Sequence, residues 1–243
     1  ERAKMAAFGM TRRAGRSASN DDVLAAVLDA GTAAVCLVGK THEFHVVTAL
    51  GITLDENLAA IRDSVAHAVA KGREVLFDAE HFFDGYRANQ GYALDCLRAA
   101  YGAGARWVVL CDTNGGTLPG EVGRITGEVI AAGIPGERLG IHTHNDTETA
   151  VAATLAAVDA GARQIQGTLN GLGERCGNAN LTSLIPTLLL KAPYAGRYRI
   201  GVAREALAGL TQVSRMLDEV LNRAPEAAAP YVGTSAFAHK AGL

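Results

Sequence analysis

The chain has 243 residues, of which 49% are hydrophobic and 20% charged, with a formal net charge of -2 at pH 7. This length and composition indicate a globular protein with a substantial core. The charge balance and the scattered basic residues exclude an extended basic surface, so no nucleic-acid partner is expected. No apolar run approaches the roughly 18 residues of a membrane span, and the amino terminus lacks a signal-peptide pattern, so we expect a cytoplasmic protein with no membrane partner.

Six apolar, β-branched segments alternate with segments of helical periodicity along the chain. Their nearly continuous hydrophobicity is typical of parallel strands that are buried on both faces. Glycine follows a small residue before several of them, as at Ala160-Gly161, where it suits the left-handed residue that ends a helix. Strands are therefore predicted at residues 5–9, 33–38, 74–79, 107–111, 139–144 and 164–168.

Amphipathic helices are predicted between these strands. Apolar residues recur at helical spacing from Leu54 to Val65, and Thr53 with Glu56 forms a predicted capping box at the start of that helix. The segment after Thr147 repeats the pattern, and residues 202–221 are predicted to form one more amphipathic helix.

Polar residues follow the predicted strands directly. Alternating strands and helices indicate either a doubly wound sheet or a (β/α)8 barrel, and functional residues after several different strands favour the barrel. Since a closed barrel needs eight strands, we expect a (β/α)8 TIM barrel that lacks its first two strand-helix units, over residues 1–193. Residues 194–243 are expected to begin a helical linker subdomain.

Two histidines, His142 and His144, lie one residue apart at the end of the fifth predicted strand. Because successive side chains of a strand point to opposite faces, both imidazoles share a face and can bind one cation. The alternative is that one histidine packs in the core while the other is solvated.

Five sequence words carry a resemblance to a known family. They are AFGMTRRAG at 7–15, DAEHFFDGY at 78–86, CDTNGGTLP at 111–119, GIHTHND at 140–146 and GLGERCGNAN at 171–180. In this order they resemble the acyl-CoA-condensing metallolyase barrel family, which includes isopropylmalate, homocitrate and citramalate synthases, with hydroxymethylglutaryl-CoA lyase as a relative. The likeness covers essentially the whole chain and is closest to the citramalate synthase group.

The resemblance implies a divalent metal, Zn, Mn, Co or Mg, held by His142, His144 and Asn178. Asn178 has the alternative role of a turn residue. The family's fourth ligand is an Asp in a word reading Asp-Thr-Thr-Leu-Arg-Asp-Gly, which this sequence does not contain. We therefore expect an incomplete metal site and no activity from this chain alone.

The reaction implied by the resemblance is a Claisen condensation of acetyl-CoA with a pyruvate-like 2-oxo acid, in branched-chain amino-acid biosynthesis that leads to isoleucine. Glu80 would assist proton transfer, Thr113 and His45 would contact the 2-oxo acid, and Asp78 would line the same pocket. Many relatives carry Ser in place of Asp78, which leaves the substrate open. Glu80 could instead be a solvated carboxylate, Thr113 a turn hydroxyl and His45 a helix-start residue.

Other functions stay open at this point. The chain could be an isopropylmalate or homocitrate synthase, or a carbon-carbon lyase of the same family. Lyase relatives place a reactive Cys early in the Gly-rich loop, whereas here the only Cys in that loop is Cys176, next to Gly177, which disfavours cleavage. Outside the enzymes, it could be an inactive barrel fragment with an assembly or regulatory role. A homodimer is expected, and His239 in the final segment receives no catalytic role.

Overall fold

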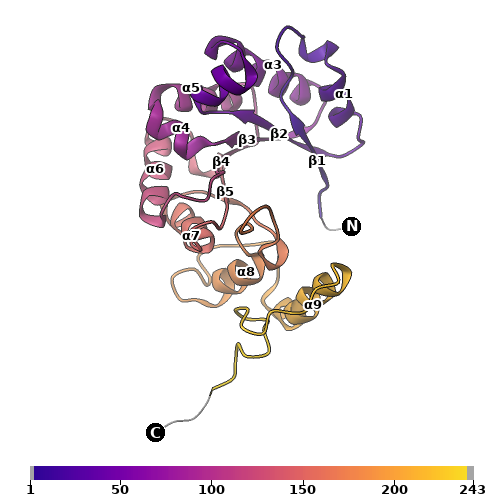
Figure 1. Cartoon of the computed structure of the whole chain (residues 1–243), viewed down its shortest axis with the longest axis vertical. Coiled ribbons are helices and arrows are strands. Elements are labelled where there is room, and N and C mark those ends of the chain that lie inside the picture. Colours follow the sequence, from indigo (N-terminus) through magenta and orange to yellow (C-terminus); the bar gives the residue numbers. More distant parts are fainter. Residues whose placement is uncertain (1–2, 240–243) are drawn as a thin grey trace. The chain divides into compact units, whose positions relative to one another are not determined.

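The computed structural model describes residues 3–239, which divide into two compact units that meet in the sequence at Gln166 and Gly167. The first unit contains a parallel sheet of six strands in the order β1-β2-β3-β4-β5-β6 (Figure 1). The strands are β1 (Ala6–Met10), β2 (Ala34–Lys40), β3 (Glu74–Glu80), β4 (Trp107–Asp112), β5 (Leu139–Thr143) and β6 (Gln164–Gln166).

All six predicted strands are confirmed, each within two residues at either end. Every strand pairs in parallel with the next strand in the sequence. A doubly wound sheet would reverse its strand order at a switch point, whereas a (β/α)8 barrel keeps sequential order. The observed order therefore excludes the doubly wound alternative.

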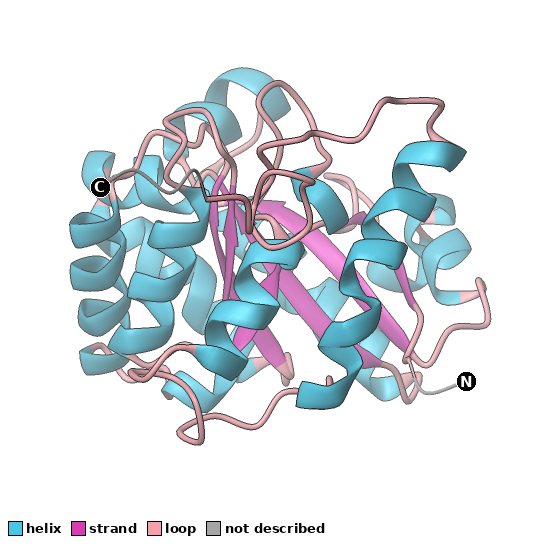
Figure 2. Ribbon diagram, turned by 90° about the horizontal axis from the view of Figure 1, so that it is seen from below, coloured by secondary structure: helices cyan, strands magenta, loops and turns pink. Residues whose placement is uncertain are grey.

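Helices connect the strands of the first unit and lie along one face of the sheet in Figure 1, and Figure 2 shows the strands themselves side by side. This placement follows from parallel strands, because each right-handed crossover returns on the same side when the order is sequential. The α-helices are α1 (Asp22–Leu28), α2 (Glu43–His45), α3 (Leu54–Ala70), α4 (Phe82–Ala88), α5 (Gln90–Gly102), α6 (Pro119–Ala131) and α7 (Ala150–Ala160); the shorter turns are η1 (Ala18–Asn20), η2 (Val46–Leu50, a π-helix) and η3 (Gly136–Arg138).

The two faces of this sheet differ in chemistry. Phe77, Leu110 and Ile141 are fully buried and belong to the hydrophobic core between sheet and helices. Because side chains alternate along a strand, Asp78 and His142 lie on the opposite face. That face therefore carries titratable side chains in the middle of an otherwise apolar sheet.

Local sequence signals explain two helix starts. Thr53 Oγ1 accepts a hydrogen bond from the Glu56 amide at 3.1 Å, which confirms half of the predicted capping box. The Glu56 carboxylate instead contacts Arg12 Nη1 at 2.7 Å. Asn89 separates α4 from α5, and its Oδ1 accepts from the Tyr92 amide at 3.1 Å.

The second unit contains η4 (Leu169–Gly171), α8 (Leu181–Leu190), η5 (Arg204–Gly209) and α9 (Leu210–Val220). The prediction of one helix over 202–221 is wrong for its first part, because the α-helix begins only at Leu210, after a 3-10 turn. Gly209 accounts for this start, since glycine loses more backbone entropy in a helix than other residues. The domain boundary at residue 193 stays a prediction, and the last four residues of the predicted linker segment, 240–243, lie outside the described residues.

Candidate functional site

The two histidines of the predicted metal site converge in the first unit. His142 lies in β5, and the amide of His144 donates to Asp112 O of β4 at 3.3 Å, so the line of the strand continues past its assigned end. The Nε2 atoms of His142 and His144 are 3.2 Å apart. Two nitrogen ligands at a zinc distance of about 2.0–2.1 Å and a tetrahedral angle would be about 3.3 Å apart. The pair therefore fits two adjacent ligands of one cation.

Two histidines alone do not complete a metal site. Across residues 3–239, no group of three or more His, Cys, Asp or Glu side chains is arranged to hold a metal ion. From the described residues, further ligands would therefore be amide, hydroxyl or carbonyl oxygens.

His142 is anchored by a glutamine that was not singled out from the sequence. Its Nδ1 lies 2.7 Å from Gln166 Oε1, and Gln166 Nε2 donates to Asp78 Oδ1 at 2.7 Å. Asp78 is only 6% exposed, and the Cys36 thiol also hydrogen-bonds its carboxylate. Burial raises the pKa of Asp78, while the bond from Gln166 and the charge of a protonated His142 oppose that rise. The predicted substrate contact of Asp78 is untested, and its observed contact is with Gln166.

Glu80 lies at the carboxyl end of β3, two residues after Asp78 and on the same face. The strand register places it opposite Lys40 of β2, and Lys40 Nζ lies 2.6 Å from Glu80 Oε2. Both side chains are partly exposed, at 20% and 25%. The carboxylate is therefore positioned by an ammonium group at the sheet edge that also carries His144.

The backbone directly after Glu80 is strained. His81 has φ 58° and ψ 32°, a left-handed conformation that non-glycine residues adopt at a cost of about 1–3 kcal/mol. The His81 amide donates to Thr113 Oγ1 at 2.8 Å. Thr113, predicted to contact substrate, thus fixes the turn that presents Glu80.

His45 lies in a group of three imidazoles at the end of β2. Its ring centroid is 4.1 Å from that of His81 and 5.0 Å from that of His42. Burial lowers the pKa of His45, and the neighbouring His81 and His42 lower it further. His45 therefore favours the neutral form, in which one ring nitrogen donates and the other accepts.

Asn178, the predicted third ligand, belongs to the second unit. It is 9% exposed, and its backbone N–H donates a hydrogen bond to Gly171 O at 3.0 Å. A Cβ atom on Gly173 would lie 1.9 Å from Asn178 Oδ1, so this loop closes around the Asn178 side chain only because residue 173 is glycine. The loop thus encloses the Asn178 side chain on the side of Gly173.

The four cysteines form no disulfide with one another. Cys36, Cys96 and Cys111 are buried, whereas Cys176 in the Gly-rich loop is exposed. No helix among the described residues is long and apolar enough to cross a membrane.

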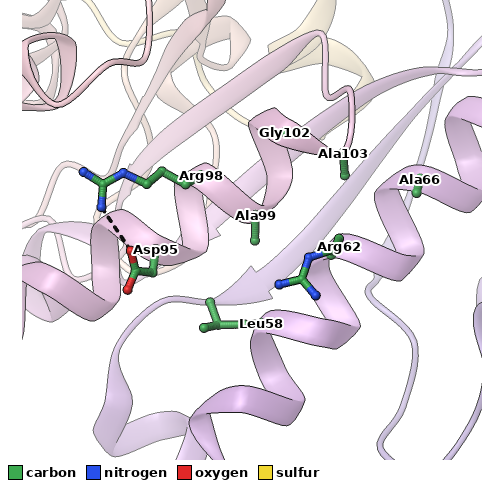
Figure 3. A pocket seen from close by; sticks show the side chains of 8 residues that line it. All are labelled: Leu58, Arg62, Ala66, Asp95, Arg98, Ala99, Gly102 and Ala103. Carbon is green, nitrogen blue, oxygen red and sulfur yellow. Dashed lines mark hydrogen bonds and ion pairs between the residues drawn. The ribbon is translucent and has the colours of Figure 1, made fainter.

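A surface pocket lies away from these residues, between α3 and α5 (Figure 3). Its lining includes Arg62, Asp95 and Arg98 around small side chains such as Ala66 and Ala99. None of the candidate site residues lines it. The pocket is a groove on the helical side of the first unit.

Residues 9–212 match the model of the HMGL-like family. The chain belongs to the HMGL-like family. It is 51% identical over its whole length to an (R)-citramalate synthase of Synechocystis sp. and 52% identical over 99% of its length to one of Streptomyces coelicolor. It covers 45% and 44% of these proteins, so it spans less than half of the relatives it matches. A probable 2-isopropylmalate synthase of Methanopyrus kandleri is 36% identical over 90% of the chain.

Solved structures of HMGL-like proteins share this fold. The HMG-CoA lyase of Bacillus subtilis has a TM-score of 0.71 at 18% identity, covering 89% of this chain and 70% of that one. A lyase from Acinetobacter baumannii, solved with coenzyme A and 3-methylmalate, has a TM-score of 0.71 at 20% identity, covering 97% and 74%. These neighbours are TIM barrels, which confirms the predicted fold class of a (β/α)8 barrel represented by six strands.

Proposed function

We propose that this chain forms part of the catalytic barrel of an enzyme that condenses acetyl-CoA with a 2-oxo acid, in the manner of a citramalate synthase. The observation that carries the proposal is the convergence of His142 and His144 Nε2 atoms, 3.2 Å apart, on the sheet face that also carries Glu80. Identity of about half to several (R)-citramalate synthases over the whole chain supports pyruvate as the 2-oxo acid.

His142 and His144 are the residues that would hold a divalent metal, and Asn178 stays the predicted third ligand on the sequence resemblance alone. When bound, the metal would supply a Lewis acid that polarises the carbonyl of the 2-oxo acid. Two imidazole ligands suit zinc better than magnesium or manganese, which prefer oxygen ligands, and the proposed metal stays one of Zn, Mn, Co or Mg.

Glu80 would move a proton of the acetyl group or orient that group. Its ion pair with Lys40 and the strained turn at His81 fix the carboxylate at the sheet edge. Such positioning is typical of a general acid or base, which must reach hydrogen-bond distance of the reacting atom. His45, with its lowered pKa, would line the 2-oxo acid pocket as a neutral hydrogen-bonding group.

Isopropylmalate synthesis is the second candidate, supported by the 36% identity to the protein from Methanopyrus kandleri. Carbon-carbon cleavage has less support, because the lyase structures are only 18–20% identical and Cys176 is not at the position where lyase relatives carry their reactive cysteine. Cytoplasmic action and a homodimer complete the proposal.

The test is metal-dependent thiol release from acetyl-CoA, measured on the full-length protein with a panel of 2-oxo acids. We expect pyruvate to give the highest kcat/KM, and 2-oxoisovalerate to be the best substrate only if the second candidate is right. The absence of metal-dependent release with every 2-oxo acid would contradict the proposal.

Glu80→Gln gives the matched active-site test. Because general acid-base catalysis contributes roughly 10²–10⁴-fold, we expect kcat to fall at least about 100-fold. Glu74→Gln, at the amino end of the same strand, should leave kcat within about threefold. Equal effects of the two variants would remove Glu80 from the chemistry.

A further inference from the structure

The inner face of the first unit contains a hydrogen-bonded chain of side chains that ends on a predicted metal ligand. It runs from Asp78 of β3 through Gln166 of β6 to His142 of β5 and on to His144. These two contacts of Gln166 are each 2.7 Å long, and Gln166 also hydrogen-bonds the Cys36 thiol. The sequence distance between Asp78 and Gln166 is 88 residues, so this is a tertiary contact rather than a local turn.

The contact between Gln166 and Asp78 spans the sheet. β3 and β6 are three strand steps apart in the sheet order, which in a flat sheet would separate them by roughly 14 Å. The two side chains meet because the sheet curves toward this face, as barrel strands do. Gln166 therefore reaches over the neighbouring strands to a buried partner, so that Asp78 holds one end of its amide and His142 the other.

The donor and acceptor groups of these side chains fix the direction of each hydrogen bond in the series. A carboxylate only accepts hydrogen bonds, so the NH2 group of Gln166 faces Asp78 and its carbonyl oxygen faces His142. The carbonyl oxygen in turn requires a donor, so Nδ1 of His142 carries the proton. A neutral imidazole protonated at Nδ1 has its lone pair on Nε2, the atom that faces His144.

We propose that Gln166, oriented by Asp78, is a positioning residue that selects the Nδ1-protonated tautomer of His142 and thereby presents its Nε2 atom to a divalent metal. Asp78 then acts on the ligand through Gln166 and makes no contact with substrate. The inference rests on the proposed metal site, but the tautomer is a property of the metal-free protein. Partners of this kind commonly change metal affinity by about 10–100-fold when they are removed.

The test measures metal affinity in the full-length protein by competition of Zn²⁺ and Co²⁺ with a chromophoric chelator. Gln166→Met keeps the side-chain length and removes both the donor and the acceptor. We expect it to weaken metal binding about 10–100-fold. Binding within twofold of the wild type would overturn the proposal. Unfolding of the metal-free variants, followed in the presence of a chelator, separates lost affinity from lost structure.

A reciprocal exchange gives the specific control. Gln166→Glu places two carboxyl groups side by side and should also weaken binding. Gln166→Glu combined with Asp78→Asn restores an acceptor toward His142 and a donor between the two side chains, so affinity should return to within about threefold of the wild type. A double variant that binds metal as weakly as Gln166→Glu alone would contradict the proposed role of Gln166 and Asp78.

The tautomer itself can be read without metal, from the ¹⁵N chemical shifts of His142. We expect Nδ1 to carry the proton in the wild type and in the double variant, and a mixture of tautomers in Gln166→Met. A wild-type His142 protonated at Nε2 would overturn the proposal even if Gln166→Met does not fold. If the wild type binds no metal, or if His142→Ala binds as tightly as the wild type, the proposed metal site falls while the tautomer result stands by itself.

Discussion

The two faces of the six-stranded sheet are built from the same strands but differ in their side chains. Phe77, Leu110 and Ile141 pack against the helices with no exposed surface. Asp112, on the same face at the end of β4, is also buried, and the Thr117 amide and hydroxyl donate to its carboxylate. One residue further along two of these strands, Asp78 and His142 face the other way. The face toward the helices is apolar except at the strand ends, whereas the other face carries polar side chains in the middle of its strands.

Two buried carboxylates, Asp21 and Asp78, show how much their partners matter. Asp21 accepts hydrogen bonds from the amides of Arg13 and Leu24 and from the Arg13 guanidinium, and although burial acts to raise its pKa, these donors lower it to about 2. Asp78 has a glutamine amide and a thiol as its neighbours and no cationic side chain bonded to it, so burial dominates and raises its pKa. The structural acid is charge-compensated, and the acid of the candidate site is not.

The largest expected effect comes from the packing face. Phe77→Ala removes a fully buried aromatic side chain and should lower the free energy of unfolding by about 3–5 kcal/mol. Asp78→Asn, on the next residue and the opposite face, is nearly isosteric and should change it by less than about 1 kcal/mol. Urea unfolding measures both, and equal losses would mean that the faces do not differ as described.

A close approach behind the site gives the next largest effect. A Cβ atom on Gly85 of α4 would lie 2.4 Å from Thr41 O and 2.9 Å from His42 Cα, in the segment that leads to His45. Gly85→Ala should therefore cost about 1–3 kcal/mol. Gly102→Ala, at the end of α5, meets nothing within 4 Å and should stabilise the protein by up to about 1 kcal/mol. Thermal unfolding distinguishes them, and a neutral Gly85→Ala would refute the close contact.

The smallest effect is pH-dependent. Asp21→Asn keeps the N-cap oxygen of α1 but loses the charge that pairs with Arg13, so we expect a loss of about 1–2 kcal/mol at pH 7. Because the folded pKa of about 2 lies below the unfolded value of about 3.9, the wild-type advantage is present above pH 4 and lost as pH falls toward 2. Asp55→Asn, in the first turn of α3, is the control without such a partner. A loss that does not depend on pH would exclude the charge as its cause.

The sequence predicts the strands well because a parallel strand buried on both faces leaves a continuous apolar run. It also predicts that His142 and His144 share a face, since side-chain alternation is a property of every strand. The role of Gln166 could not be predicted from the sequence, because it depends on a partner 88 residues away and on the curvature of the sheet. The sequence does contain one signal, since Gln166 follows Gln164 by two residues in the strand next to β5, and the parallel register places it beside His142.

The strained turn at His81 and the helix start at Leu210 also depend on more than periodicity. His81 adopts a left-handed conformation, in which its backbone amide donates a hydrogen bond to the Thr113 hydroxyl. The two residues belong to segments that follow different strands. The segment before Leu210 has the right apolar spacing, but Gly209 interrupts the α-helix. Spacing patterns do not contain these tertiary hydrogen bonds or local entropy costs.

The most direct test of the metal site is anomalous scattering from crystals of the protein grown with Co²⁺ or Zn²⁺. The pair of imidazoles predicts an anomalous peak about 2.0–2.2 Å from the Nε2 atoms of both His142 and His144, with Gln166 still bound to Nδ1 of His142. A protein that binds its metal elsewhere, with the two histidines still in contact with each other, would contradict this assignment.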